Sequence, residues 1–454
     1  KKWIKMMKGV GRQSVSSPVH RQLPSFPFSP PQNLTSSPPA NRASAMAYLP
    51  PHRRHSSSSE PAPTPFPPIS SLQSLSISSP RGRGRHHLRP SNNKIIHAAG
   101  CVSRWSPLPP FPPGPDDAES FRLVPFPCDP IERETGAKPL VLALSSPQNS
   151  SDSTEVAVAA IVERFLPDLL TAAERARATA TAHDAPTEDE ELKLSLVARV
   201  GKVLFQPGPS GGPVSVDSVR DAAKAGAEGS RSQVRKSFYT NLPGKCVDEI
   251  GMYIGKLTDL KFDSSKKHYH VKVFDKQRSD TTMSCKCTVQ EDGKLVIHKV
   301  ELNQIRQLVE DISCLSKDFD LRLMLRTKRI LKNIDPEVEN AIKSLVSSAI
   351  VDPDAKGGLK WPLGFESIGE RFSIVGVWHT SYSAFRNKTL RLKLRCADRF
   401  DHRSSTGEIS NEVTFKLTGI SERLQDGNEE VDTLKGMLES AVQMIWDTVL
   451  SYKI

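Results

Sequence analysis

Basic side chains alternate with apolar ones in three segments of the second half of the chain. The basic positions are Arg322, Arg326, Lys328, Arg391, Lys393, Arg395 and Lys416. Since every second side chain of a β-strand points to the same face, neighbouring strands with this pattern would gather the charges on one outward basic platform. Such a platform suits the phosphates of RNA or another polyanion. The alternative is an ordinary solvated sheet face whose charges pair with nearby acids.

Two pairs of metal-ligand residue types lie close in sequence, His268 with His270 and Cys285 with Cys287. On adjacent strands of a hairpin they could form a tetrahedral zinc site. The alternation argues against this site, because Val271 shares the apolar face with the cysteines and leaves both histidines on the opposite face. We therefore predict buried structural cysteines and no metal site.

An enzyme remains the alternative to a binding protein. Its site would gather Trp378, His379, Asp398 and Asp401, which lie in two late segments that contain both acids and a histidine. The sequence contains no phosphate loop, dinucleotide fingerprint or zinc motif, which favours a non-enzymatic protein without a cofactor.

The first 115 residues differ in composition from the rest of the chain. They contain 15 of the 62 Lys and Arg residues, one of the 51 acids and 22 of the 36 prolines. The remainder has 62 − 15 = 47 basic and 51 − 1 = 50 acidic residues, so its net charge is −3. A segment so rich in proline, serine and positive charge does not bury enough apolar surface to fold, and we predict a disordered tail over residues 1–93.

The basic tail carries its own candidate site. Arg81, Arg83 and Arg85 alternate with glycines and form a flexible cationic cluster of the kind that binds RNA phosphates without reading bases. The same segment is Ser-rich, Arg-rich and poor in acids, which is also typical of a transit peptide. We expect a protein of the cytoplasm or nucleus, with the plastid as the alternative. The scattered, odd number of cysteines favours a reducing compartment, and no apolar run is long enough to cross a membrane.

Met46 is the expected start of translation, because the chain begins with Lys1 and a Met-Ala pair follows inside the tail. Read from there, Met-Ala-Tyr-Leu-Pro-Pro-His-Arg-Arg-His-Ser resembles the opening of a family of uncharacterised plant proteins that begin Met-Ala-Tyr-Ile-Pro-Pro-His-Lys-Arg-His-Ser. The resemblance extends over roughly residues 46–454, and its most specific pieces are residues 377–380 and 398–401. It implies no biochemical function.

The same opening is similar to an N-terminal element of cytoplasmic DEAD-box RNA helicases that contacts the cap-binding translation factor. The matching residues are Tyr48, Pro50, Pro51 and His52, whereas Arg53 stands where those helicases have leucine. The similarity implies docking to a ribonucleoprotein partner through a stiff proline-rich segment. The alternative is an unstructured basic N-terminus, and the oligomeric state stays open.

Periodicity predicts an α+β fold with largely antiparallel sheets and packed helices. The expected helices are residues 154–177, 216–225, 243–257, 336–350 and 431–449. Residues 94–98 are expected to open the folded part. The expected strands are residues 141–144, 194–205, 268–275, 281–289, 294–302, 321–328, 372–380, 390–396 and 413–417. Residues 107–115 read as a surface loop. We divide the body into an N-terminal α/β part, residues 94–232, and a C-terminal α+β part, residues 233–454.

Overall fold

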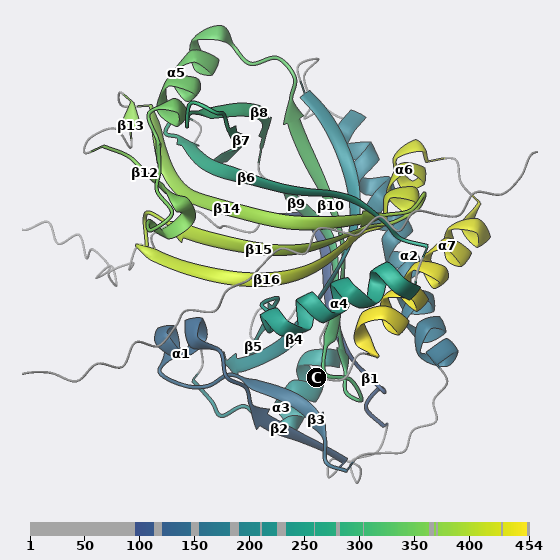
Figure 1. Cartoon of the computed structure of the whole chain (residues 1–454). Coiled ribbons are helices and arrows are strands. Elements are labelled where there is room, and N and C mark those ends of the chain that lie inside the picture. Colours follow the sequence, from purple (N-terminus) through teal and green to yellow (C-terminus); the bar gives the residue numbers. More distant parts are fainter. Residues whose placement is uncertain are drawn as a thin grey trace, which may run out of the picture. The chain divides into compact units, whose positions relative to one another are not determined.

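Most strands of the protein belong to one large, mainly antiparallel sheet (Figure 1). The structure is a computed structural model that describes residues 96–451, with the exception of 113–119, 147–153, 182–189, 209–210, 225–232, 258, 278–281, 303, 363–366, 369–370 and 428–429. Mixed helices and strands around an antiparallel sheet confirm the predicted fold class. The tail of residues 1–93 and its candidate motifs lie outside the described residues.

Part of this sheet closes on itself. The strands of the ring are, in order, β10 (Asp320–Leu331), β8 (Leu295–Glu301), β7 (Thr282–Val289), β6 (Lys261–Asp275), β14 (Phe372–Arg386), β15 (Arg391–Asp401), β16 (Thr406–Lys416) and β4 (Glu190–Pro207). β4 then pairs with β10 from the Gly201–Asp320 pair to the Glu190–Leu331 pair, which is the whole length of β10. The result is a closed antiparallel barrel.

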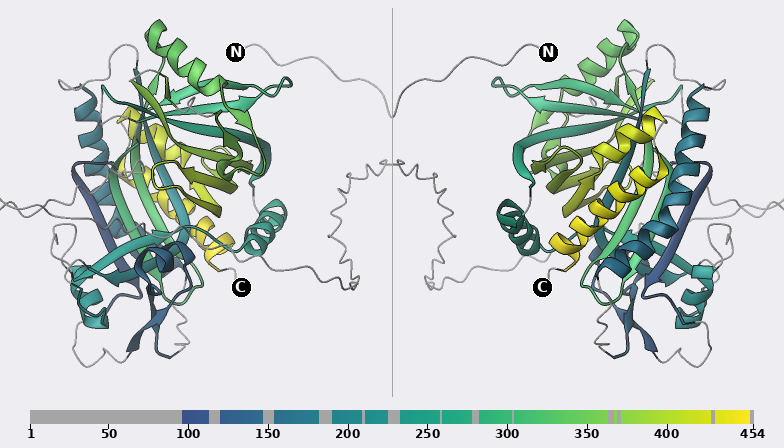
Figure 2. Two further views of the ribbon diagram at one scale, coloured as in Figure 1. Left: turned by 90° about the vertical axis from the view of Figure 1, so that its left-hand side faces the viewer. Right: turned by 90° about the vertical axis from the view of Figure 1, so that its right-hand side faces the viewer.

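The outer face of the barrel is apolar on the side of β4 and β10. Leu196 and Leu323 are fully buried there against α2 (Thr154–Thr181), whose apolar residues recur at helical spacing. The same core contains residues of α4 (Gly244–Leu257), α6 (Thr418–Asp426), α7 (Val431–Ile445) and the short π-helical segment η4 (Trp446–Leu450). Figure 2 shows α2 and α7 lying along this side of the barrel.

A second apolar cluster covers the outer face of β6, β7 and β14. Helix α5 (Pro336–Ser347) packs there, with Asp335 accepting hydrogen bonds from the first backbone N–H groups of the helix. Trp361 donates from Nε1 to the Leu345 carbonyl at 2.9 Å. The connecting elements are β11 (Ile350–Val351), η3 (Lys356–Gly358), β12 (Leu359–Lys360) and β13 (Ser367–Ile368).

The N-terminal part of the described chain builds onto one end of the barrel. β1 (Ile96–Leu108) runs parallel to β9 (Ile305–Cys314), and β9 pairs with β10. The far half of β4 pairs with β5 (Val234–Tyr239) and β3 (Leu140–Leu144), next to β2 (Phe121–Pro125). Helices α1 (Asp129–Thr135) and α3 (Val216–Lys224) complete this part, whose core contains Trp105 and Phe205.

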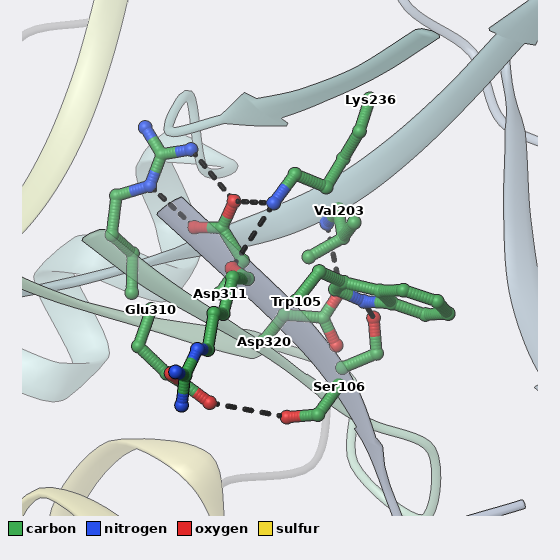
Figure 3. A network of polar contacts seen from close by, with 10 residues as sticks. Trp105, Ser106, Val203, Lys236, Glu310, Asp311 and Asp320 are labelled. Carbon is green, nitrogen blue, oxygen red and sulfur yellow. Dashed lines mark hydrogen bonds and ion pairs between the residues drawn. The ribbon is translucent and has the colours of Figure 1, made fainter. Parts of the chain in front are cut away.

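Buried polar contacts join this part to the barrel (Figure 3). Asp311 of β9 accepts bonds of 2.5 and 3.0 Å from Arg322 and pairs with Lys236 at 3.0 Å. Burial alone would raise the pKa of Asp311, but these two cations lower it to about 2. Asp320 accepts the backbone N–H groups of Val203 and Cys314. The Asp311 and Asp320 carboxylates therefore fix β9, β10 and β4 at this end of the barrel.

The predicted helices agree with α2, α3, α4, α5 and α7, whereas α1 and α6 were not predicted and several expectations about strands were wrong or incomplete. Residues 107–115 are not simply a loop, because Pro107 and Leu108 belong to β1 and pair with β9. Pro107 fits in this position because β1 is an edge strand. Strands β2, β5 and β9 were missed. β9 lacks alternation because residues on both of its faces are buried, which removes the period of two.

No helix in the described part of the chain is long and apolar enough to span a bilayer.

The hairpin of β6 and β7 has the predicted facing of its side chains. Val271 pairs with Cys285, and His270 pairs with Lys286 on the opposite face. Cys285 and Cys287 are free, fully buried residues of the cluster around α5. The register therefore confirms that the cysteines and the histidines lie on opposite faces.

Replacing Cys285 with serine should lower the free energy of unfolding by about 1–3 kcal/mol, because the hydroxyl would be buried among apolar side chains. The matched control is Cys396→Ser, since Cys396 is exposed on the adjoining part of the barrel. Urea denaturation measures both. Equal stability of the two variants would show that Cys285 is not a core residue, and zinc lost from Cys285→Ser would overturn the assignment of the faces.

Candidate anion-binding site in the barrel

The inner face of the barrel is lined by basic side chains from every strand of the ring. Residues directly opposite each other in a ladder share a face, so the pairings assign each side chain to the inner or outer surface. The inward basic residues are Lys193, Arg199, Lys261, Lys266, Lys272, Lys286, Lys299, Arg322, Arg326, Lys328, Arg386, Arg391, Lys393, Arg395, Arg399 and Lys416. The inward acids on these strands, within the described residues, are Glu191, Glu301, Asp320, Asp401, Glu408 and Glu412.

The basic residues that the sequence singled out share one face, but this face is not an outward platform. Arg322, Arg326 and Lys328 lie on β10, and Arg391, Lys393 and Arg395 lie on β15, across the ring. The strands curve and close (Figure 1), so both sets point into the barrel. Alternation predicted the shared face correctly, whereas closure depends on a pairing between distant segments.

Five of the six singled-out residues on β10 and β15 have a polar partner. Arg322 is held by Asp311, Lys328 lies 3.3 Å from Glu301, and Arg395 lies 3.5 Å from Glu412. Arg391 pairs with Asp263 at 2.5 Å, and Arg326 donates to the Gln304 amide oxygen. Lys393 differs, because no carboxylate among the described residues pairs with it and its Nζ lies 4.3 Å from the ring centroid of Tyr382.

Two inward carboxylates remain ionised and hold the cations in place. Burial would raise the pKa of Glu412, but Arg395, Arg399 and Arg199 lower it to about 2. In the same way, Lys328 and Lys299 lower the pKa of Glu301 to about 2 against the effect of burial. Each carboxylate thus faces two or more cations, and the interior keeps an excess of positive charge.

Burial and the crowding of cations lower the pKa of two lysines to the neutral range. Burial, and then the neighbouring Arg391 and Arg395, lower the pKa of Lys393 to about 7. Burial and Arg326 do the same for Lys328, although Glu301 opposes them. An anion placed between these amines would favour their charged form.

Several guanidinium groups have unused hydrogen-bond donors. The Nε atoms of Arg199, Arg326 and Arg391 are buried and have no hydrogen-bond partner among the described residues. Burial lowers the pKa of Arg199 to about 9 and that of Arg326 to about 10, so both stay charged at neutral pH. Buried donors without a partner carry a desolvation penalty that an oxyanion ligand would remove.

Aromatic and imidazole rings complete the inner face, and sequence reasoning missed their role. Trp378 and Tyr382 of β14 point inward opposite the basic residues of β15. Lys272 lies 4.1 Å from the Trp378 ring centroid. His268 and His270 also point inward, and burial is the main reason that the pKa of each falls to about 3. The histidines are therefore neutral hydrogen-bonding groups at pH 7.

The residues considered for an enzyme do not gather in one place. Trp378 and Asp401 face the barrel interior, whereas His379 and Asp398 lie on the outer face because they alternate with them along β14 and β15. His379 stacks on Tyr269 at 4.6 Å, and Asp398 accepts a hydrogen bond from the Gly357 backbone. Over the described ranges, no group of three or more His, Cys, Asp or Glu side chains is arranged to hold a metal ion.

Residues 89–449 match the family model of a domain of unknown function, DUF7903, and the chain belongs to this family. The comparison with curated proteins gave no match.

Among solved structures, the chain is similar to the RNA triphosphatase Pct1 of S. pombe in complex with the Spt5 CTD. The identity is 10% and the TM-score 0.37, over 66% of this chain and 94% of that chain. It is also similar to a putative adenylate cyclase from Bacillus halodurans, with 10% identity and a TM-score of 0.21 over 47% and 89% of the chains. Since both TM-scores lie below 0.5, these likenesses support no inference about function.

Replacing Lys393 with methionine should raise the melting temperature of the ligand-free protein by roughly 2–4 °C, because it removes a charge from a crowded, desolvated site. The folded-state pKa lies near 7, below the unfolded value of about 10.4. The unfolded state therefore binds more protons between these values, and the lysine destabilises the fold fully below pH 7 and progressively less above it. The stabilisation by Lys393→Met should be larger at pH 6.5 than at pH 9.

Differential scanning fluorimetry at the two pH values measures this effect. Lys245→Met is the matched control, since the side chain of Lys245 is 88% exposed. A Lys393→Met variant that melts at or below the wild-type temperature at pH 6.5 would contradict the assignment of a strained cationic interior.

Proposed function

We propose that the barrel binds the phosphates of an RNA end, and that the protein acts by binding rather than catalysis. The observation that carries the proposal is the convergence of Arg and Lys side chains from opposite walls, β10 and β15, on one closed interior. Charge on this scale is matched by a ligand with several phosphates more readily than by a single carboxylate.

The interior donors suit phosphate oxygens. Arginine offers a planar fork of N–H groups that binds two phosphate oxygens at once, and lysine offers a mobile point charge. These side chains retain access to water. The exposed fraction is 23% for the Lys328 side chain and 22% for the Arg395 side chain. Ionised Glu301 and Glu412 orient these cations but do not balance all of them, which leaves net positive charge for a ligand.

The closed ring indicates that a chain terminus binds. A continuous RNA strand lies readily across an open basic sheet, but it reaches the inner face of a closed barrel only if one end enters between the ends of the strands. The β10–β4 pairing closes one side of β10 along its whole length, and on the other side β10 joins the ring strand β8 through the Ile330–Glu301 and Leu331–Val300 pairs. A terminus that carries several phosphates also presents the highest local charge of an RNA chain. We therefore expect recognition of a phosphorylated end with little base preference.

The test compares three forms of one ten-nucleotide RNA: linear with a 5′-triphosphate, linear with a 5′-hydroxyl, and covalently circular. Fluorescence anisotropy with the full chain should give the tightest binding for the triphosphate form and weak binding for the circle. Affinity should fall with salt. Equal affinity for the linear triphosphate RNA and the circular RNA would rule out binding of an RNA end inside the barrel. Absence of binding to both RNAs would rule out the RNA proposal altogether.

Substituting Arg391, Lys393 and Arg395 together by glutamine should weaken binding of the triphosphate RNA while it preserves the alternation of β15. Each lost phosphate contact should reduce the salt slope by about 0.7. The matched control replaces three exposed lysines, Lys245, Lys343 and Lys435, by glutamine and removes the same charge from the outer surface. Equal losses in both triple variants would show that only net charge matters.

The tail cluster of Arg81, Arg83 and Arg85 is proposed as a second, nonspecific RNA contact. Its substitution by glutamine should weaken binding of linear and circular RNA alike, because backbone phosphates rather than a chain end would be its target. This difference separates the tail from the barrel. The docking motif at Tyr48 to Arg53 remains a proposal for a ribonucleoprotein partner.

A further inference from the structure

A groove of about 670 Å³ opens at the end of the barrel where β6 begins and β14 ends. Its lining includes Lys261 and Phe262 of β6, Arg386 of β14, and Asn387 and Lys388 of the loop that follows. This volume lies within the range of small-ligand sites. The groove is therefore large enough for a nucleoside unit.

Phe262 gives the groove an aromatic surface. Its side chain is 61% exposed and contacts Phe385 edge to face, with the ring centroids 5.8 Å apart. The edge of one ring against the face of the other orients the pair, and the exposure leaves part of Phe262 available to a ligand. An exposed, supported aromatic ring stacks on a base of any identity, because every base has a π-face.

The groove borders the basic interior at Arg391. Arg391 is opposite Arg386 in the β14–β15 ladder and forms an ion pair with Asp263 of the groove lining at 2.5 Å. On the other side of the same strand, Arg391 is opposite Lys416. The Arg391–Asp263 ion pair therefore links an inward side chain to the lining of the groove.

The charges of the groove favour a phosphate backbone. Its two acids have partners within the site, since Asp263 is paired with Arg391 and Asp259 accepts a hydrogen bond from the Asn387 side chain at 2.9 Å. Lys261, Arg386 and Lys388 supply positive charge around Phe262. Phe262 is opposite Phe385 and lies on the outer side of the rim, next to the inward Lys261. A chain that leaves the barrel at Arg391 and turns over this rim would find cations for its next phosphate and an aromatic ring for its base.

We infer that the groove binds the nucleotide that follows the phosphorylated end, with its base stacked on Phe262. This inference rests on the proposed function, since the phosphates inside the barrel bring the base to the groove. It makes the protein selective for RNA over an inorganic phosphate chain, a distinction that the cationic interior alone does not provide.

The test uses two probes that share phosphates and differ in bases: inorganic tripolyphosphate and a 5′-triphosphorylated RNA pentanucleotide. Isothermal titration with the full chain should show that Phe262→Ala weakens the RNA about tenfold or more and leaves tripolyphosphate unchanged. Phe262→Trp should keep or improve RNA binding, because the larger ring stacks better. Ile409→Ala is the matched control, since Ile409 is a comparably exposed apolar residue, 65% exposed, on β16.

The outcomes separate the two proposals. RNA affinity unchanged by Phe262→Ala, with tripolyphosphate still bound, would overturn the groove and leave the barrel. Equal weakening of both probes by Phe262→Ala would also overturn the groove, since Phe262 would then act through the fold. Wild-type protein that binds neither probe would overturn the proposed function itself.

Discussion

The pairing of β10 with β4 is the constraint on which the rest of the structure depends. The two strands come from segments more than 100 residues apart, and they pair along the whole of β10. This ladder turns a curved sheet into a ring, which makes the apolar surface the outside and the basic surface the inside. Helices α2 and α7 then cover one apolar cluster on the outer face of the barrel, and α5 covers the other. This packing buries both apolar surfaces away from water. Without this ladder, the same alternation would form the open platform that the sequence suggests.

The polar anchors at one end of the ring explain how the closing ladder is held. Asp320, the first residue of β10, is bonded to the backbone of β4 and of β9, and Arg322 is held by Asp311. A buried carboxylate with several N–H partners is costly to move, so these contacts fix the register of β10 against both neighbours. Register matters here more than in most sheets, because a shift by one residue would put the arginines into the apolar cluster around α2.

The sequence predicted local features well and long-range ones poorly. Alternation in residues 321–328 and 390–396 predicted two strands and their basic faces. The alternation of apolar and polar residues around His270 and Cys285 predicted that these two side chains lie on opposite faces of the hairpin. These properties depend on neighbouring residues. Closure does not, since nothing near Arg322 indicates that its strand pairs with β4. Strand β9 was missed for a related reason. Its acids Glu310 and Asp311 are buried beside cations from distant elements, so the polar pattern that normally marks a solvent face is absent.

The candidate site was predictable in its chemistry and unpredictable in its geometry. The arginines of β10 and β15 could be named from spacing, but Arg199 was not singled out within its expected strand, and Trp378 was assigned to the alternative enzyme site. Both belong to the interior only because the ring brings β4 and β14 opposite the basic strands.

The depressed lysine pKa values tie the fold to its proposed role. If these positions were only structural, apolar residues in place of Lys328 or Lys393 would make the fold more stable. Each charged lysine is destabilised there by desolvation and by repulsion from neighbouring cations. An anion between them reverses both effects, because it favours the protonated amines and uses the unpartnered N–H groups of Arg199 and Arg326. Binding near pH 7 must then be accompanied by proton uptake, and affinity must fall as the pH rises above the lysine pKa. On the proposed function, the electrostatics that destabilise the free interior would therefore also favour binding of a phosphate ligand.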